Sequence, residues 1–152
     1  MYRRIELREA GVHYNVPIST PQDLVISATE SRIYVAFGRL RDAAIAVIDR
    51  QSNTVIAVSR PGTAHLNSAR CIVPGNLAVH PDGERLYLLS GMGLHVFDIN
   101  NLAVKKITGS HIDLGAHCVA VNPNGNHAYI IHPDGTIVAL IDAITDKLIS
   151  GY

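Results

Sequence analysis

The sequence predicts an all-β fold made of three stacked, four-stranded units. One stretch is written three times, at residues 23–62, 76–109 and 117–151. Each copy holds short apolar runs separated by clusters of Gly, Pro, Asp and Asn, which is the composition of turns. No helical apolar period persists over any window of about 11 residues. Because units of this size cannot bury their own faces singly, the three copies are expected to pack against one another.

A tyrosine and an aspartate mark the same two places in every copy. The aspartate ends the third apolar run, where its carboxylate can accept hydrogen bonds from the amides of the following turn. The copies differ in length through insertions at turns, which stacked repeats tolerate. The marker residues are Tyr34, Tyr87 and Tyr129, followed by Asp49, Asp98 and Asp142.

The apolar patterns distinguish inner strands from edge strands. Residues 129–131 and 137–141 are apolar without alternation, as in strands that are buried on both faces. The fourth run of the second copy contains Lys105 and Lys106 between apolar residues, which suits a partly solvated edge strand. Four-stranded units of about 40 residues, stacked face to face, are the blades of a β-propeller. In the second copy the four strands are predicted at residues 77–79, 86–89, 94–97 and 104–107.

The second and third copies resemble the YVTN β-propeller repeat, and the match spans residues 21–152. In that family an apolar triplet leads to a Pro-x-Gly turn, a tyrosine-centred strand, a Val-Ile-Asp strand and a Thr-x-x-Val turn into the outer strand. The first copy keeps Tyr34 and "VIDRQSNTV" but has "SATES" where the Pro-x-Gly turn should stand. The motif residues are Pro81, Gly83, Tyr87 and Asp98, then Pro123, Gly125, Tyr129 and Asp142.

Three blades, expected at residues 21–62, 74–110 and 116–152, do not close a ring. Propellers usually have about 4–8 blades, so each terminal blade would leave one apolar face exposed. We expect two chains to meet head to tail in a homodimer and to form a six-bladed ring. Residues 1–70 carry a net charge of +3 and residues 71–152 one of −3, which fits that pairing. Alternatively, residues 1–20 add one or two strands that cap or complete a blade, or the chain is part of a longer propeller.

Composition excludes several classes of protein. The net charge of zero argues against nonspecific attraction to nucleic acid. No apolar run approaches the roughly 18–20 residues of a membrane span, and no secretory signal is visible, so we expect a cytoplasmic protein. Cys71 and Cys118 do not make a disulfide framework. Without a Gly-rich phosphate loop or a paired-cysteine zinc motif, no cofactor or metal is expected.

The best candidate for a ligand site is the mouth of the channel. His117 immediately precedes the innermost strand of the third copy, nearly as Gln22 and Gly75 do in the others. The family resemblance implies that ligand-contacting groups lie there, and that some related enzymes place metal-binding histidines there. His111 and Asp113 precede His117 in the same loop, and imidazole with carboxylate suits acid–base chemistry or a divalent metal. No spacing among them is diagnostic of a metal site.

The insertion "RPGTAHLNSARCIVPG" is a second candidate, because long loops on a rigid scaffold often bind ligands. It either reaches a ligand from the same rim or covers the joint between chains. Among the other histidines, His95 is expected to be a packed or partly solvated strand residue, and His80, His127 and His132 to be exposed in turns. The ligand-binding candidates of the insertion are Arg60, His65, Asn67 and Arg70.

Two functions fit these patterns. The first is a non-catalytic binding or scaffold module that self-associates and holds a small molecule or a protein at one rim. The second is a hydrolase or lyase, implied by the resemblance to lactone-hydrolysing and related propellers, with His117, His111 and Asp113 as catalytic residues. The sequence leaves open whether the protein is an enzyme.

Overall fold

The structure is a computed structural model that describes residues 21–37, 44–59, 74–90, 93–108, 118–131 and 138–150. The regular elements in these ranges are all β-strands. No helix with the length and apolarity to cross a membrane occurs among these residues. Residues 1–20 and most of the insertion after β4 lie outside these ranges, so the predictions made for them stay predictions.

Twelve described strands form three antiparallel sheets of four, and in each sheet the strands follow chain order. The first sheet holds β1 (Pro21–Ile26), β2 (Arg32–Phe37), β3 (Ala44–Asp49) and β4 (Thr54–Ser59). The second holds β5 (Pro74–Val79), β6 (Arg85–Ser90), β7 (Gly93–Asp98) and β8 (Val104–Thr108). The third holds β9 (Cys118–Val121), β10 (His127–Ile131), β11 (Val138–Asp142) and β12 (Lys147–Ser150).

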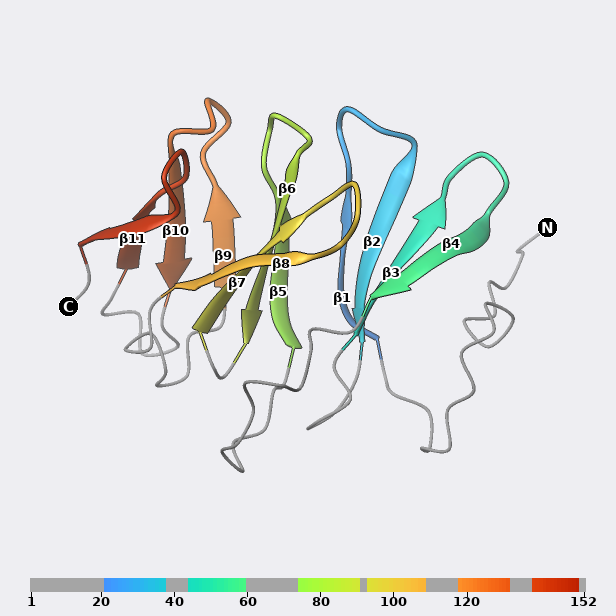
Figure 1. Cartoon of the computed structure of the whole chain (residues 1–152), viewed down its shortest axis with the longest axis horizontal. Coiled ribbons are helices and arrows are strands. Elements are labelled where there is room, and N and C mark those ends of the chain that lie inside the picture. Colours follow the sequence, from blue (N-terminus) through green and yellow to red (C-terminus); the bar gives the residue numbers. More distant parts are fainter. Residues whose placement is uncertain are drawn as a thin grey trace.

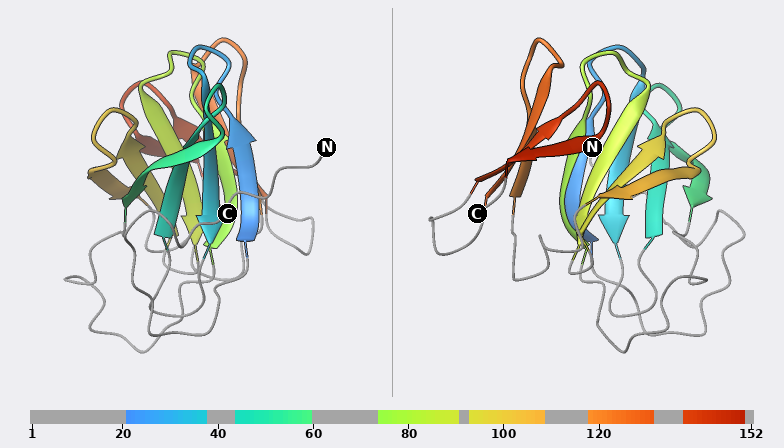
Figure 2. Two further views of the ribbon diagram at one scale, coloured as in Figure 1. Left: turned by 90° about the vertical axis from the view of Figure 1, so that its right-hand side faces the viewer. Right: turned by 60° about the vertical axis from the view of Figure 1, so that its left-hand side comes forward.

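The three sheets stand side by side and face one another (Figures 1 and 2). The first strand of each sheet lies against the first strand of the next, because β1 contacts β5 and β5 contacts β9. The fourth strands, β4, β8 and β12, form the opposite edges of their sheets. The prediction that residues 104–107 form an edge strand is therefore confirmed.

The apolar core lies in the two joints between sheets. In β6, Tyr87 and Leu89 belong to the cluster shared with the third sheet, whereas Leu86 and Leu88 belong to the cluster shared with the first. The second sheet is thus buried on both faces. In the third sheet the prediction that residues 129–131 lie in a strand buried on both faces is wrong, because Tyr129 and Ile131 are 37% and 43% exposed. At roughly 25 cal/mol per Å² of buried apolar area, these joints are the main source of stability.

The turn after each third strand is held by its aspartate, as the sequence predicts. The carboxylate of Asp49 accepts hydrogen bonds from the amides of Gln51 at 3.1 Å and Ser52 at 2.7 Å. These bonds to the Ser52 amide and hydroxyl, with that from Gln51, lower the pKa of Asp49. Four residues after each aspartate the chain turns through a left-handed conformation, at Asn53, Leu102 and Asp146, with φ of 56°, 54° and 54°.

The first turn differs from its two equivalents, and its blade forms nonetheless. In the second and third sheets Gly83 and Gly125 adopt φ of 75° and 74°, which glycine permits without strain. In the first sheet the hydroxyl of Ser27 accepts hydrogen bonds from the amides of Thr29 at 3.3 Å and Glu30 at 3.1 Å. A serine turn thus replaces the missing Pro-x-Gly sequence.

Candidate functional site

The described strands present two rims with different residues. The turns that follow the first and third strands of each sheet lie at the upper end in Figure 1, and β1, β5 and β9 begin at the lower end. Gln22, in β1, and Gly75, in β5, therefore lie at the lower rim, and Gln22 is exposed. The other predicted site residues, Arg60, His65, Asn67, Arg70, His111, Asp113 and His117, lie outside the described residues.

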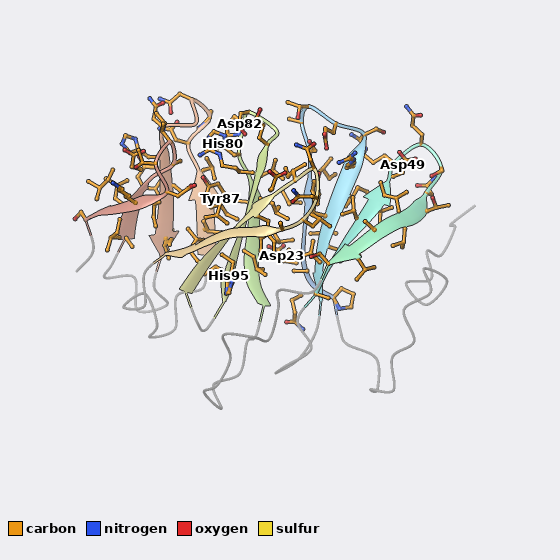
Figure 3. The ribbon with its side chains drawn as sticks, viewed as in Figure 1. Asp23, Asp49, His80, Asp82, Tyr87 and His95 are labelled. Carbon is orange, nitrogen blue, oxygen red and sulfur yellow. The ribbon has the colours of Figure 1, made fainter. Side chains whose placement is uncertain are left out.

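Asp23 is a polar residue of the lower half that the sequence analysis did not single out (Figure 3). Its Oδ2 accepts a hydrogen bond from the amide of Leu77 in the second sheet at 2.7 Å, and its Oδ1 accepts one from the amide of Leu24 at 2.8 Å. Asp23 thus ties two innermost strands together beside the predicted rim. The sequence held one signal for this residue: when β1 is aligned with β5, Asp23 and Asn76 take equivalent places, so both copies have a polar residue just before the leucine of this strand.

A second group of polar side chains lies at the upper joint between the second and third sheets. We call it the upper joint cluster, and it consists of His80, Asp82, Arg85, Tyr87 and Asp146. Figure 3 shows His80 and Asp82 at the top of the second sheet, with Tyr87 below them.

His80 corrects one sequence-based expectation, because it is buried rather than exposed. Its Nε2 lies 2.8 Å from the carbonyl oxygen of Gly125 in the next sheet, to which it donates, and its Nδ1 lies 2.7 Å from Oδ1 of Asp82. A Cβ at Gly125 would lie 2.9 Å from Cε1 of the ring. The histidine is therefore buried because the neighbouring turn is a glycine, which no pattern within the second copy reveals. His127 is partly exposed, and His132 lies outside the described residues.

Arg85 connects the turn of its own sheet to the third sheet. One guanidinium nitrogen donates to Asp82 Oδ2 at 2.8 Å, and the other donates to the carbonyl oxygen of Ala143 and lies 3.7 Å from Asp146 Oδ1. Burial opposes ionisation of Asp82, but hydrogen bonds from the Glu84 amide, Arg85 and His80 outweigh it and lower the pKa of its carboxyl group. The ion pair thus stays charged at neutral pH.

Tyr87 completes the cluster from below. Its hydroxyl donates to Asp146 Oδ1 at 3.2 Å and lies 3.4 Å from the carbonyl oxygen of Ala143. Burial and the nearby carboxylate of Asp146 raise the pKa of Tyr87. In the first sheet Tyr34 is equally buried and donates to Glu30 at 3.1 Å, and burial raises its pKa to about 12. Both tyrosines are therefore hydrogen-bond donors at neutral pH, and the upper joint cluster serves the packing of sheets.

His95 lies deep in the joint between the first and second sheets. Its ring centroid is 6.3 Å from that of Phe97, and burial lowers the pKa of its imidazole. The prediction that His95 is a packed strand residue is confirmed. Among the described residues, no group of three or more His, Cys, Asp or Glu side chains is placed to hold a metal ion.

The outward faces of the first and third sheets expose large apolar side chains. We call the outward face of the third sheet the C-terminal face; it includes Tyr129 and Ile131, which are 37% and 43% exposed. The outward face of the first sheet, the N-terminal face, includes Leu24 and Ile26, which are 58% and 51% exposed, and also the buried residues Val35, Ala46 and Ile48. Scattered exposed apolar residues are common on soluble proteins, but a set that shares one sheet face indicates an interaction surface.

Comparison with solved structures identifies the architecture. Hydrazine synthase of Kuenenia stuttgartiensis superposes with a TM-score of 0.69 at 18% identity over 93% of this chain. The WD40 repeats of RRP9 give 0.67 at 13% identity over 90%. A β-propeller domain of Myceliophteria thermophila gives 0.66 at 12% identity over 88%. The fold is that of a β-propeller. Each four-stranded sheet of this chain is one blade.

The chain accounts for only part of such a propeller. It covers 38%, 39% and 41% of these three solved chains. The three blades thus span less than half the length of each solved chain. No family model matches the sequence, and no curated protein matches it. The resemblance to the YVTN repeat therefore stays a prediction, whereas the partial propeller is established by the fold.

Proposed function

We propose that this protein is a non-catalytic binding scaffold, a partial β-propeller that self-associates and holds a small molecule or a protein at its lower rim. The observation that supports this most directly is the contrast between the two kinds of surface in the described blades. Buried polar groups hydrogen-bond across the joints between blades, whereas large apolar side chains stand exposed on both terminal faces. The first pattern stabilises a rigid frame, and the second is that of an assembly surface.

The lower rim is the proposed binding edge. The first strands of the three blades begin at this rim and lie next to one another. The residues that start these strands are therefore close together at the lower rim. Gln22 supplies an exposed amide at this edge, and Gly75 leaves the backbone of β5 without a side chain. The catalytic alternative depends on His111, Asp113 and His117, which lie outside the described residues.

Chemical-shift mapping on isotope-labelled protein tests the binding edge. The probes are a mixture of small carboxylic acids and sugars and a set of tetrapeptides. We expect the amide shifts to change at residues 22, 23 and 75, and the Gln22→Ala variant to lose most of that change. Asn100→Ala, an exposed residue of an upper turn, is the matched control and keeps the response. Shifts confined to the upper turns would contradict the proposal.

A further inference from the structure

The two joints inside the chain follow one pattern. In each, the tyrosine-bearing strand of one blade faces the first and second strands of the next blade. Tyr34 belongs to the cluster that contains Leu77 and Leu86 of the second blade. Tyr87 belongs to the cluster that contains Val119 and Ala128 of the third blade. The residues that meet at a joint can therefore be assigned by their position in a blade.

The C-terminal face has the tyrosine side of this pattern. Tyr129 pairs with Leu140 in its sheet, as Tyr87 pairs with Val96 and Tyr34 with Val47. Ile131 follows Tyr129 by two residues on the same face, at the place of Leu89 in the second blade. Tyr34 and Tyr87 are fully buried, and Tyr129 is 37% exposed because no described blade follows it.

The N-terminal face has the receiving side of the same pattern. The strand registers place Leu24 where the second blade has Leu77 and the third has Val119. Leu77 and Val119 are 5% and 3% exposed beneath the preceding blade, and Leu24 is 58% exposed. At its innermost strand the first blade thus exposes the half of a joint that the third blade lacks, whereas Val35, Ala46 and Ile48 on its next two strands are already buried.

We propose that the C-terminal face of one copy packs on the N-terminal face of a second copy, and that the two copies form two such joints and close a six-bladed ring. This inference rests on the self-association in the proposed function and names the surface that performs it. Two identical joints related by a two-fold axis cover the exposed apolar residues of both terminal faces in both copies. Six blades lie within the range of about 4–8 that propellers use.

The proposed joint also places the hydroxyl of Tyr129 beside the turn that contains Asn53 of the second copy. Within the chain, Tyr87 donates to Asp146, which is the left-handed residue of the turn after β11. Asn53 is the left-handed residue at the same place in the first blade, with φ 56°, and it is exposed. The hydroxyl of Tyr129 therefore donates to the side-chain oxygen of Asn53 in the second copy. His127 takes the place of Arg85 beside it.

Charge and size agree with this pairing. Residues 1–70 carry a net charge of +3 and residues 71–152 one of −3, and this asymmetry along the sequence favours the head-to-tail approach of two copies. Glu30 occupies the place at which the other two blades have Gly83 and Gly125. The residue facing it would be Asn122, which replaces His80 and has a shorter side chain.

Sedimentation equilibrium of single and mixed variants tests the joint. Wild-type chains of 16.4 kDa are expected to form a particle of two chains. Leu24→Asp and Tyr129→Asp each place a carboxylate in both joints, and each is expected to raise the dissociation constant at least about 100-fold. The matched control is Ile144→Asp, at a residue of the turn after β11 that is 67% exposed; this control stays dimeric.

Mixing the two monomeric variants gives the decisive result. One of the two joints then combines the unaltered C-terminal face of the Leu24→Asp chain with the unaltered N-terminal face of the Tyr129→Asp chain. We expect a particle of two chains, held by one joint, that binds at least about 10-fold more tightly than either variant alone. Circular dichroism checks that each variant is folded, and Tyr129→Ser replaces Tyr129→Asp if the latter is not.

The possible outcomes distinguish a failure of this particular joint from a failure of self-association as a whole. A wild-type chain that stays monomeric at micromolar concentration overturns the self-association itself. A wild-type dimer that tolerates Leu24→Asp, or variants that do not combine when mixed, overturns this joint and leaves another mode of association. Binding at the lower rim is measured separately and does not depend on either result.

Discussion

Tyr87 and Tyr129 occupy the same place in successive blades, yet their surroundings differ completely. Tyr87 is fully buried and donates its hydroxyl to Asp146 of the next blade. Tyr129 stands on the C-terminal face with 37% of its surface exposed. Leu77 and Leu24 differ in the same way at the opposite side of a blade. The position of a residue within a blade sets the direction of its side chain, and the neighbouring blade decides whether that side chain is buried.

Tyrosine and leucine at equivalent positions therefore have different surroundings in the internal joints and on the terminal faces. In the internal joints, apolar and polar side chains together stabilise the fold of a single chain. On the terminal faces, Leu24, Ile26, Tyr129 and Ile131 are exposed instead. Substitutions at equivalent positions in two blades therefore test how much stability the neighbouring blade adds.

The largest difference is expected from removing the two tyrosine rings. Tyr87→Ala deletes a buried ring and its hydrogen bonds, and should lower the free energy of unfolding by about 3–5 kcal/mol. Tyr129→Ala should lower it by less than about 1 kcal/mol, because the ring is already partly hydrated. Urea denaturation measures both, in a Leu24→Asp background where the proposed joint cannot form. Equal losses at the two positions would show that the C-terminal face is covered within the chain.

A smaller loss of stability is expected at the turn glycines that pack against a side chain of the preceding blade. A Cβ at Gly83 would lie 2.2 Å from Oγ1 of Thr29 in the first blade, and the residue has φ 75°. Gly83→Ala should cost about 1–3 kcal/mol of stability through strain and crowding, and Thr29→Ala in the same chain should recover part of it. Glu30→Ala, at the equivalent place on the N-terminal face, should cost about 1–3 kcal/mol for a different reason, because it removes the hydrogen-bond partner of the buried Tyr34 hydroxyl. Thermal unfolding of these three variants measures each loss of stability.

The smallest effect concerns His95, which stands where the other two blades have Ala46 and Ala139. Burial lowers the pKa of folded His95 below its ordinary 6.5, so below about pH 6.5 the unfolded chain binds a proton that the folded chain does not. Stability should therefore be present above pH 6.5 and fall below it, by up to about 1.4 kcal/mol per pH unit.

His95→Gln removes this titration while keeping a polar side chain of similar length. Because the chain has seven other histidines, the informative quantity is the difference between the two pH–stability curves. That difference should grow in favour of the variant as the pH falls from 7 to 5. Parallel curves would mean that folded His95 binds protons as readily as in the unfolded chain.

Much of the fold could be predicted because its signals are local and repeated. The aspartate at the end of each third strand caps the turn that follows, and the sequence around Asp49 is sufficient to predict that. The strands of each blade follow chain order because short turns can connect only neighbouring antiparallel strands. The candidate rim could be located only in part, through Gln22 and Gly75, since these precede recognisable strands.

The contacts between blades could not be predicted in the same way. His80 is buried because Gly125, far along the chain, leaves room for its ring. Asp23 reaches the amide of Leu77 only once two strands from different copies lie side by side. Neither relation leaves a pattern within one copy of the repeat, so the histidine was expected to be exposed and the aspartate was not singled out.

The amino-acid sequence by itself determined the number of blades, the order of their strands and the turns that join them, because hydrogen bonds and apolar alternation over a few residues suffice for each. The tertiary structure alone decided which equivalent side chains are buried. Burial depends on the blade that lies opposite, and for the outward faces of the first and third blades no described residue of the chain supplies that blade.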